Sequence, residues 1–293
     1  EKGRIGTLVL KNRGIMMPMA TDLADKNGIV TPRQIRYYQE RAKGGFGLIT
    51  IEATVVDQTA KGGPRKSCLF DDSMIAPLAE VADACHKYGA KVSIQLQQAG
   101  PEGNAKAAGH PLKSASPIQA AAGKDVPVEM TTAQIYQLVE AYGDAALRAK
   151  EAGLDAVEVH CAHGYLVSSF LSPQTNKRLD EFGGSFENRM RLPRLILENI
   201  RKKTGSTLAV LCRINSSDEV TGGLTVQDSA LIAAYLEDCG ADALHISRSL
   251  HIHDEYMWAP TVIHGGFNAA HVETIRKAVS IPLIMVGRFN DAY

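Results

Sequence analysis

The sequence predicts an α/β protein and, within that class, a (β/α)₈ TIM barrel. Three observations lead to this prediction: short apolar runs alternate with helical patterns, the runs are almost continuously hydrophobic, and one order of helix, glycine and strand recurs. Continuous hydrophobicity is typical of strands that are covered on both faces of a parallel sheet. A repeated βα unit favours a closed barrel over an open, doubly wound sheet.

Seven apolar runs have the length of β-strands. They cover residues 15–20, 46–53, 91–96, 155–161, 208–214, 242–247 and 282–287. The phrases KYGAKVSI, EAGLDAVEV and DCGADALHI show the recurring order of helix end, glycine and strand. Right-handed crossovers are expected to place each strand parallel to the one before it.

Helical patterns fill the intervals between these runs. They cover residues 31–45, 74–89, 131–153, 188–205, 225–240 and 268–280. In the clearest of them, Thr131 or Thr132 can cap the first turn, and Gly153 follows the last. Two long insertions, 100–130 and 162–188, follow strands and therefore belong to the face on which barrels build active sites.

The seventh strand is the last that can be counted before the sequence ends at VGRFNDAY. A seven-stranded barrel would leave two long unpaired edges. We therefore expect residues 1–293 to form one barrel domain from which the last βα unit is missing.

The composition is that of a globular protein without excess charge. Hydrophobic residues make up 45% and charged residues 22%, with 32 basic and 32 acidic side chains. This balance argues against nucleic acid or an anionic membrane as partner and favours a small-molecule substrate; a homo-oligomer is compatible with it. The first ten residues are charged rather than signal-like, and no stretch approaches the roughly 18 apolar residues of a membrane span. Five scattered cysteines without metal-ligand spacing suit free thiols in the cytoplasm.

Polar side chains stand at the carboxyl end of each apolar run. They are Thr21, Glu52, Gln95, His160, Arg213, Ser247 and Arg288. Each alone could be a cap or a loop-facing residue, but in a barrel these strand ends meet at one mouth. Their common position predicts an active site there.

His160, His163 and Tyr165 directly follow the fourth run. Zinc binding would require a third ligand and does not match the helical His-Glu-x-x-His spacing; a structural imidazole on a buried carbonyl is a further alternative. We interpret the pair as donors that hold a substrate carbonyl, with the protonated Tyr165 phenol as proton donor. Arg213 ends a strand as a charged residue, which indicates an anion or polar ring opposite it, or a structural salt bridge.

Four segments resemble the old yellow enzyme family of flavin oxidoreductases, especially the branch with 2,4-dienoyl-CoA reductase and the bacterial NADH:flavin oxidoreductases. They are MMPMATDLADKNGIVTPRQIRYYQERAKGGFGLITIEAT, SIQLQQAG, VEVHCAHGYLVSSFLSPQTNKRLDEFGGSFENRMR and LIMVGR. The resemblance implies an eight-stranded barrel with noncovalently bound FMN, NAD(P)H as reductant and an activated alkene as acceptor. In that branch, a [4Fe-4S] centre and an FAD-binding region follow the barrel, beyond the position of residue 293.

The resemblance also assigns cofactor-binding residues. They are Pro18, Met19, Ala20, Thr21, Ala53, Gln95, Arg213, Gly287 and Arg288. Gln95 is expected at the pyrimidine edge of the flavin and Arg213 beside N1 and the C2 carbonyl, where a cation stabilises the reduced ring. Gly287 and Arg288 are expected at the phosphate.

For the substrate, the resemblance implies that His160 and His163 bind the acceptor carbonyl and that Tyr165 donates the proton. A further histidine, His251 or His253, lies in the loop after the sixth strand, and His253 is taken as substrate-binding. The stretch RLDEFGGSFENR, residues 178–189, is expected to be structural.

The chain departs from the family pattern after Gln95. Gln98 and Pro101 stand where the family has a His and an Arg. The predicted function is an FMN-dependent ene-reductase that uses NADH or NADPH on an α,β-unsaturated carbonyl or enoyl thioester. The alternatives are a flavin dehydrogenase of an amine or saturated carbonyl compound, and a barrel that only binds a ligand.

Overall fold

The computed structural model describes residues 1–60 and 63–289. In this part of the chain, seven parallel strands form one sheet in which each strand pairs with the preceding one. They are β3 (Ile15–Met16), β4 (Leu48–Val55), β5 (Lys91–Gln97), β8 (Ala156–Cys161), β9 (Ala209–Asn215), β10 (Ala243–Ser247) and β11 (Leu283–Met285). All seven predicted strands, and their parallel order, are confirmed.

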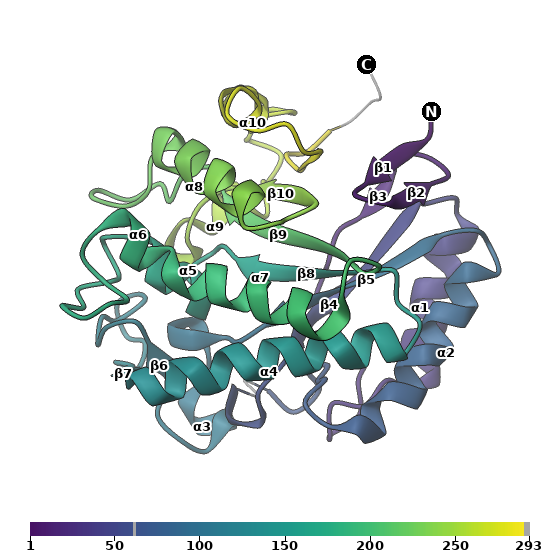
Figure 1. The fold of residues 1–293 in the computed structure, drawn as a ribbon, viewed down its shortest axis with the longest axis horizontal. Helices are drawn as coiled ribbons and strands as arrows, with labels where there is room; N and C mark the ends of the chain where they lie inside the picture. Colours follow the sequence, from purple (N-terminus) through teal and green to yellow (C-terminus); the bar gives the residue numbers. More distant parts are fainter. Residues whose placement is uncertain (61–62, 290–293) are drawn as a thin grey trace.

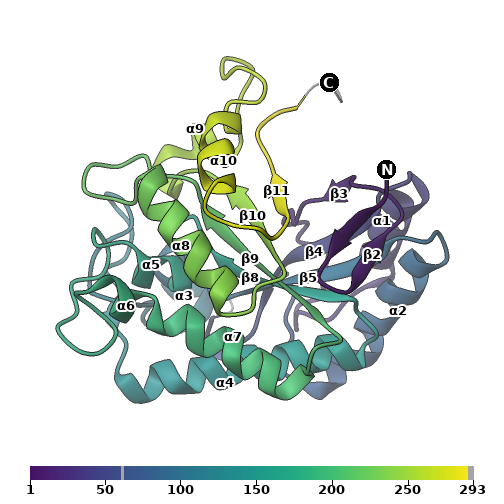
Figure 2. The ribbon, with the colours of Figure 1, turned by 45° about the horizontal axis from the view of Figure 1, so that its top comes forward.

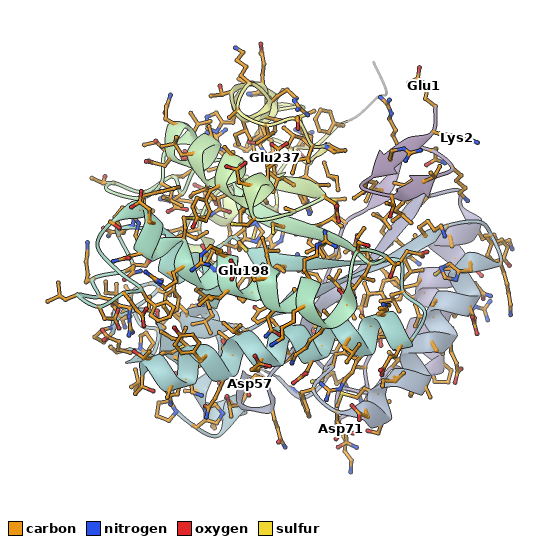
Figure 3. All side chains as sticks on the ribbon, in the orientation of Figure 1. Glu1, Lys2, Asp57, Asp71, Glu198 and Glu237 are labelled. Atoms are coloured by element: carbon orange, nitrogen blue, oxygen red, sulfur yellow. The ribbon has the colours of Figure 1, made fainter. Side chains whose placement is uncertain are left out.

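Six longer helices cover the outside of this sheet. They are α1 (Pro32–Lys43), α2 (Ile75–His86), α4 (Thr132–Glu151), α7 (Arg191–Thr204), α8 (Val226–Asp238) and α10 (Ala269–Arg276). Figure 1 shows α4, α7 and α8 side by side on the outer face of β8 and β9. Glu198 lies on the solvent face of α7 and pairs with Arg194 one turn earlier (Figure 3).

The start of α4 illustrates how the sequence fixes these helices. The Thr131 hydroxyl accepts a hydrogen bond from the Gln134 amide at 3.2 Å, and the Gln134 side chain accepts one from the Thr131 amide at 3.0 Å. This capping box satisfies two amide donors that the first turn leaves without partners. The predicted cap is therefore Thr131.

The shorter elements lie in the loops that follow strands. They are η1 (Gln58–Ala60), η2 (Asp72–Met74), η3 (Gly100–Glu102), α3 (Ala105–Ala108), β6 (Lys113–Ser114), β7 (Val128–Glu129), α5 (Leu166–Leu171), α6 (Phe186–Arg189), η4 (His251–His253) and α9 (Asp254–Met257). Arg178 is buried in these loops and donates to the backbone carbonyls of Ala115 and Met130. This contact gives the loop around residues 178–189 the structural role expected of it.

A hairpin that the sequence analysis did not predict closes the amino end of the barrel. Strands β1 (Gly3–Ile5) and β2 (Leu8–Leu10) pair antiparallel. Ile5 and Leu10 are buried against the first residues of the barrel strands, including Leu48, Ala156 and Ala243. The hairpin therefore covers the amino end of the barrel.

Two aspartates fix the amino ends of neighbouring strands. Asp155, just before β8, accepts from the Val92 amide of β5 at 2.9 Å and from Lys91 at 2.8 Å. Asp242, just before β10, accepts in the same way from the Val210 amide of β9 at 2.8 Å. These are the aspartates of the repeated phrases GLDA and GADA, so the repeat in the sequence is a repeated strand anchor.

The barrel is nearly closed in the described residues. Strands β3 and β11 form the two edges of the sheet, and a groove between them is lined by residues of both, among them Ile15 and Ile284. Figure 2 shows these edges facing each other beside the β1–β2 hairpin. In the same residues, no helix is long and apolar enough to cross a membrane.

Candidate active site

The carboxyl ends of the strands form one pocket, here named the central pocket. It is lined by Pro18, Met19, Ala20, Ala53, Gln95, His160, His163, Tyr165, Arg213, Met257 and Trp258. Strand register explains the convergence, because Gln95 of β5 stands opposite Glu158 of β8, and His160 opposite Arg213 of β9. Most of the predicted cofactor and substrate residues thus share one cavity.

The end of β8 places three aromatic rings together. The ring centroids of His160 and Tyr165 lie 4.7 Å apart, and those of His160 and His163 lie 5.1 Å apart. His163 has a φ of 62° and Gly164 a φ of 79°, so two consecutive left-handed residues turn the chain back over the strand end. The Asn215 side chain holds this turn by accepting from the His163 amide at 3.2 Å.

Burial sets the protonation states of these rings. It lowers the pKa of His160 and of His163 well below the ordinary value of histidine, and the Arg213 charge lowers both further. Burial also raises the pKa of the Tyr165 phenol. At neutral pH the two imidazoles are therefore uncharged and the phenol keeps its proton.

The Tyr165 hydroxyl has a histidine partner from the loop after β10. Nε2 of His251 lies 2.9 Å from the hydroxyl oxygen, and the two ring centroids are 5.1 Å apart. Neither His251 nor His253 lines the central pocket, and His253, which the sequence analysis carried into the substrate site, contacts Glu255 at 3.2 Å. The histidine that meets Tyr165 is thus His251.

Beneath these rings lies a buried polar network that the sequence analysis missed. Gln95 donates to Glu158 at 2.7 Å, and Nδ1 of His245 lies 3.0 Å from the other carboxylate oxygen. Although burial opposes it, His245 and Arg213 hold the pKa of Glu158 below its ordinary value. A signal was present in the sequence: Glu158 and His245 each precede a recognised residue by two positions and so share its face of the strand.

Two atoms of this network are buried without a hydrogen-bond partner among the described residues. They are Nε of Arg213 and Nε2 of His245. Buried polar atoms in native proteins are normally paired. The unpaired Arg213 donor therefore fits a pocket that receives a polar ring, as expected for the isoalloxazine of FMN.

The segment from Pro18 to Thr21 is held from behind by Glu52. The Thr21 amide donates to Glu52, whose other oxygen accepts from Gln34 at 2.7 Å and from the Ser67 hydroxyl at 2.6 Å. Thr21 itself does not line the central pocket. Glu52, which lies within β4 three residues before its end, fixes the backbone that would lie along the cofactor.

A second cavity, here named the arginine pocket, adjoins the central pocket through Met19, Arg213 and Met257. Three arginines line it, Arg213, Arg248 and Arg288, together with Gly287. The Arg248 guanidinium pairs with Glu219 at 2.8 Å, and that of Arg288 donates to the carbonyls of Thr261 and Ile263. Guanidinium groups bind phosphate well. The predicted phosphate residues Gly287 and Arg288 therefore lie where an anion attached to a ring in the central pocket can be held.

A third cavity, here named the outer pocket, adjoins the central pocket at Ala20, Ala53 and Tyr165. Its volume of about 690 Å³ is within the range of small-molecule sites. Lys124 and Glu102 on its wall form an ion pair at 2.8 Å. The outer pocket thus meets the central pocket beside the Tyr165 ring.

The two departures from the family pattern are structural. Gln98 and Pro101 are buried and line neither the central nor the outer pocket. The Gln98 side chain accepts from the Gly100 amide at 2.5 Å, and its carbonyl accepts from the Leu166 amide at 3.1 Å. This loop therefore holds the start of α5, next to Tyr165.

The described residues contain no group of three or more His, Cys, Asp or Glu side chains placed to hold a metal ion. His160 and His163 accordingly have no third ligand within that part of the chain. The five cysteines all lie in the described part of the chain, and no disulfide joins any two of them there.

Comparison with known proteins gives close relatives. NADH oxidase of Thermoanaerobacter brockii is 39% identical over 295 residues, which cover 99% of this chain and 45% of that protein. A solved 2-naphthoyl-CoA reductase complex matches with a TM-score of 0.90 at 30% identity, covering 99% of this chain and 46% of that one. An old yellow enzyme homologue from Zymomonas mobilis matches with a TM-score of 0.84 at 26% identity, covering 99% and 82%. The chain spans about half the length of the first two.

The model of the NADH:flavin oxidoreductase / NADH oxidase family matches residues 4–293. This match covers the barrel and all three pockets, and it confirms the resemblance and the barrel fold predicted from the sequence. FMN, with NAD(P)H as reductant, is the cofactor chemistry of this family. The chain belongs to the NADH:flavin oxidoreductase / NADH oxidase family, the family of the old yellow enzymes.

Proposed function

We propose that this chain is the catalytic barrel of an NAD(P)H-dependent ene-reductase that reduces the C=C bond of an α,β-unsaturated carbonyl or enoyl thioester. The observation that carries the proposal is the cluster of two neutral imidazoles and one protonated phenol in the central pocket. Gln95 and Arg213 line the same cavity. A pure binding site has no evident need for a proton donor beside two carbonyl-binding groups.

FMN, when bound, supplies the hydride that reduces the alkene carbon. His160 and His163 hold the substrate carbonyl oxygen and stabilise the negative charge that develops on it. Tyr165 delivers a proton to the neighbouring carbon, and its hydroxyl is oriented by His251 at 2.9 Å. Arg213 supplies the cation that favours the reduced, anionic flavin.

The residues that would hold the cofactor follow from the three pockets. Pro18 to Ala20 and Ala53 provide the surface along the ring, and Gln95 and Arg213 the polar groups at its edge. Gly287, Arg288 and the neighbouring arginines provide the phosphate site. The outer pocket takes the substrate, and the 2-naphthoyl-CoA bound to the matching solved reductase supports a thioester among the candidates.

The test begins with an absorption spectrum of the purified full-length protein, which should show bound oxidised flavin. One sample is then reduced with NADH or NADPH and mixed with an enone or an enoyl thioester, and a second sample, kept oxidised, is mixed with an amine. Reoxidation by an enone or thioester supports the proposal. Reduction of the oxidised flavin by the amine instead would identify an amine dehydrogenase, and a colourless protein would leave only ligand binding.

A further inference from the structure

Ser247, the last residue of β10, connects the arginine of the central pocket to one of its histidines. Nη2 of Arg213 donates to the Ser247 hydroxyl oxygen at 3.1 Å. The same oxygen lies 2.7 Å from Nε2 of His163. All three side chains are buried, and the contact joins residues 84 positions apart in the sequence.

The number of protons on each group shows which atom donates and which accepts in these two contacts. A guanidinium group only donates, so the serine oxygen must accept from Arg213. If the oxygen accepted from an Nε2–H of His163 as well, the serine's own proton would be buried without an acceptor, because Nε2 of His163 is the one other polar atom within hydrogen-bond distance of the hydroxyl among the described residues. The serine therefore donates to Nε2, and the proton of the neutral His163 ring lies on Nδ1.

We propose that Ser247 is a positioning residue that fixes the tautomer of His163, so that this ring presents Nδ1–H to the substrate carbonyl. The effect of this tautomer on alkene reduction rests on the proposed function. The tautomer itself does not.

His160 is fixed in the opposite tautomer by a backbone contact. Its Nδ1 accepts a hydrogen bond from the Ala162 amide at 3.3 Å, so its ring proton lies on Nε2. Nε2 of His160 and Nδ1 of His163 make no hydrogen bond within the described residues, and neither is a fully buried atom. Each ring therefore uses one nitrogen for the protein and keeps one N–H for a ligand in the pocket that both rings line.

The arrangement determines what the pocket can bind. Two N–H donors on adjacent rings match the two lone pairs of one carbonyl oxygen. If His163 instead carried its proton on Nε2, the ring would offer the carbonyl a lone pair, which repels it. By fixing the tautomer, Ser247 thus determines whether the His163 ring presents an N–H donor or a lone pair to the substrate oxygen.

The experiment measures the tautomer directly by ¹⁵N NMR of histidine-labelled full-length protein, with His163→Gln used to assign the His163 signals. In the wild type we expect a protonated Nδ1 and a bare Nε2. In Ser247→Ala the Nε2 donor is lost, and proton density should move to Nε2. Ser247→Thr keeps a hydroxyl and should restore the wild-type pattern.

Ser93→Ala is the matched control, because Ser93 is also a buried strand serine and lies outside the central pocket, and its side chain makes no hydrogen bond to any described residue. Relative to it, Ser247→Ala should slow reoxidation by the alkene about tenfold, the upper range for one neutral hydrogen bond. A wild-type His163 protonated on Nε2, or an unchanged tautomer in Ser247→Ala, would overturn the proposal. A wild type that reduces no alkene would remove the proposed function and leave the tautomer measurement standing.

Discussion

The two ends of the barrel use the same strands but satisfy their polar groups differently. At the amino end, Asp155 and Asp242 each accept a strand amide and pair with a cation, beneath the β1–β2 plug. At the carboxyl end, Arg213 and His245 each keep a buried nitrogen without a partner among the described residues. The two aspartates at the amino end thus have partners from the chain itself, whereas these two nitrogens at the carboxyl end are available to a ligand.

Backbone strain follows the same division. Every left-handed non-glycine residue in the described chain lies in a loop after a barrel strand: Asp22, His163, Glu219, Ser249 and Arg288. Such conformations cost free energy and persist where function requires them. The groups that stabilise the barrel and the groups proposed for its chemistry are therefore separated along the barrel axis.

The largest effect is expected from Tyr165→Phe at the carboxyl end. Losing the proton donor should slow alkene reduction on the order of 10²-fold or more. Reduction of the flavin by NAD(P)H needs no phenol and should stay unchanged. Stopped-flow measurement of the two half-reactions separates these effects; an unaltered alkene step would remove Tyr165 from the chemistry.

Asp242→Ala tests the amino end. The change leaves the Val210 amide without its acceptor and Arg201 without its carboxylate partner. Because the ion pair is partly exposed, we expect a loss of about 2 kcal/mol in the free energy of unfolding, measured by urea titration. Alkene turnover per folded molecule should not change. A fall in that turnover would contradict the separation of the two ends.

The sequence predicted the strands and helices well because their signals are local. Apolar runs, glycines and capping threonines each act within a few residues. The β1–β2 hairpin was missed because its strands are only three residues long. Its burial depends on contacts with Leu48 and Ala156, which are distant in the sequence.

Within the site, the sequence identified residues but not their partners. The resemblance pointed to His160, His163 and Tyr165, whereas choosing between His251 and His253 required the path of an irregular loop. Ser247 was recognised as a polar strand end, but its contact with His163 depends on the register of three strands. Side-chain contacts between different strands of the barrel therefore could not be predicted from the sequence and required the structure.

A fall in pH should lower the free energy of unfolding mainly through buried histidines at the carboxyl end of the barrel. Burial lowers the pKa values of His160, His163 and His245, so the native state excludes protons that the unfolded state binds below about pH 6.5. The free energy of unfolding should therefore fall as the pH drops below that value, by up to about 1.4 kcal/mol for each histidine at pH 5.5.

The matched variant for this effect is His163→Asn. Its unfolding free energy should fall by about 1.4 kcal/mol less than that of the wild type between pH 7.5 and 5.5. Urea titrations at the two pH values measure the difference. An equal fall in both proteins would mean that the native state does not lower the pKa of His163, and would contradict a ring held neutral by burial.

The smallest effect is expected from Gly153→Ala at the amino end. Gly153 follows α4 with a φ of +79°, and a Cβ there would meet nothing within 4 Å, so the cost is that of a left-handed alanine, about 1 kcal/mol. Turnover per folded molecule should be unchanged. Gly100, at the carboxyl end, has a φ of +59°, but its Cβ would lie 2.7 Å from the Leu166 Cα. The same substitution there must displace the chain next to Tyr165, so Gly100→Ala should also slow alkene reduction; equal turnover in the two variants would show that this loop does not position the phenol.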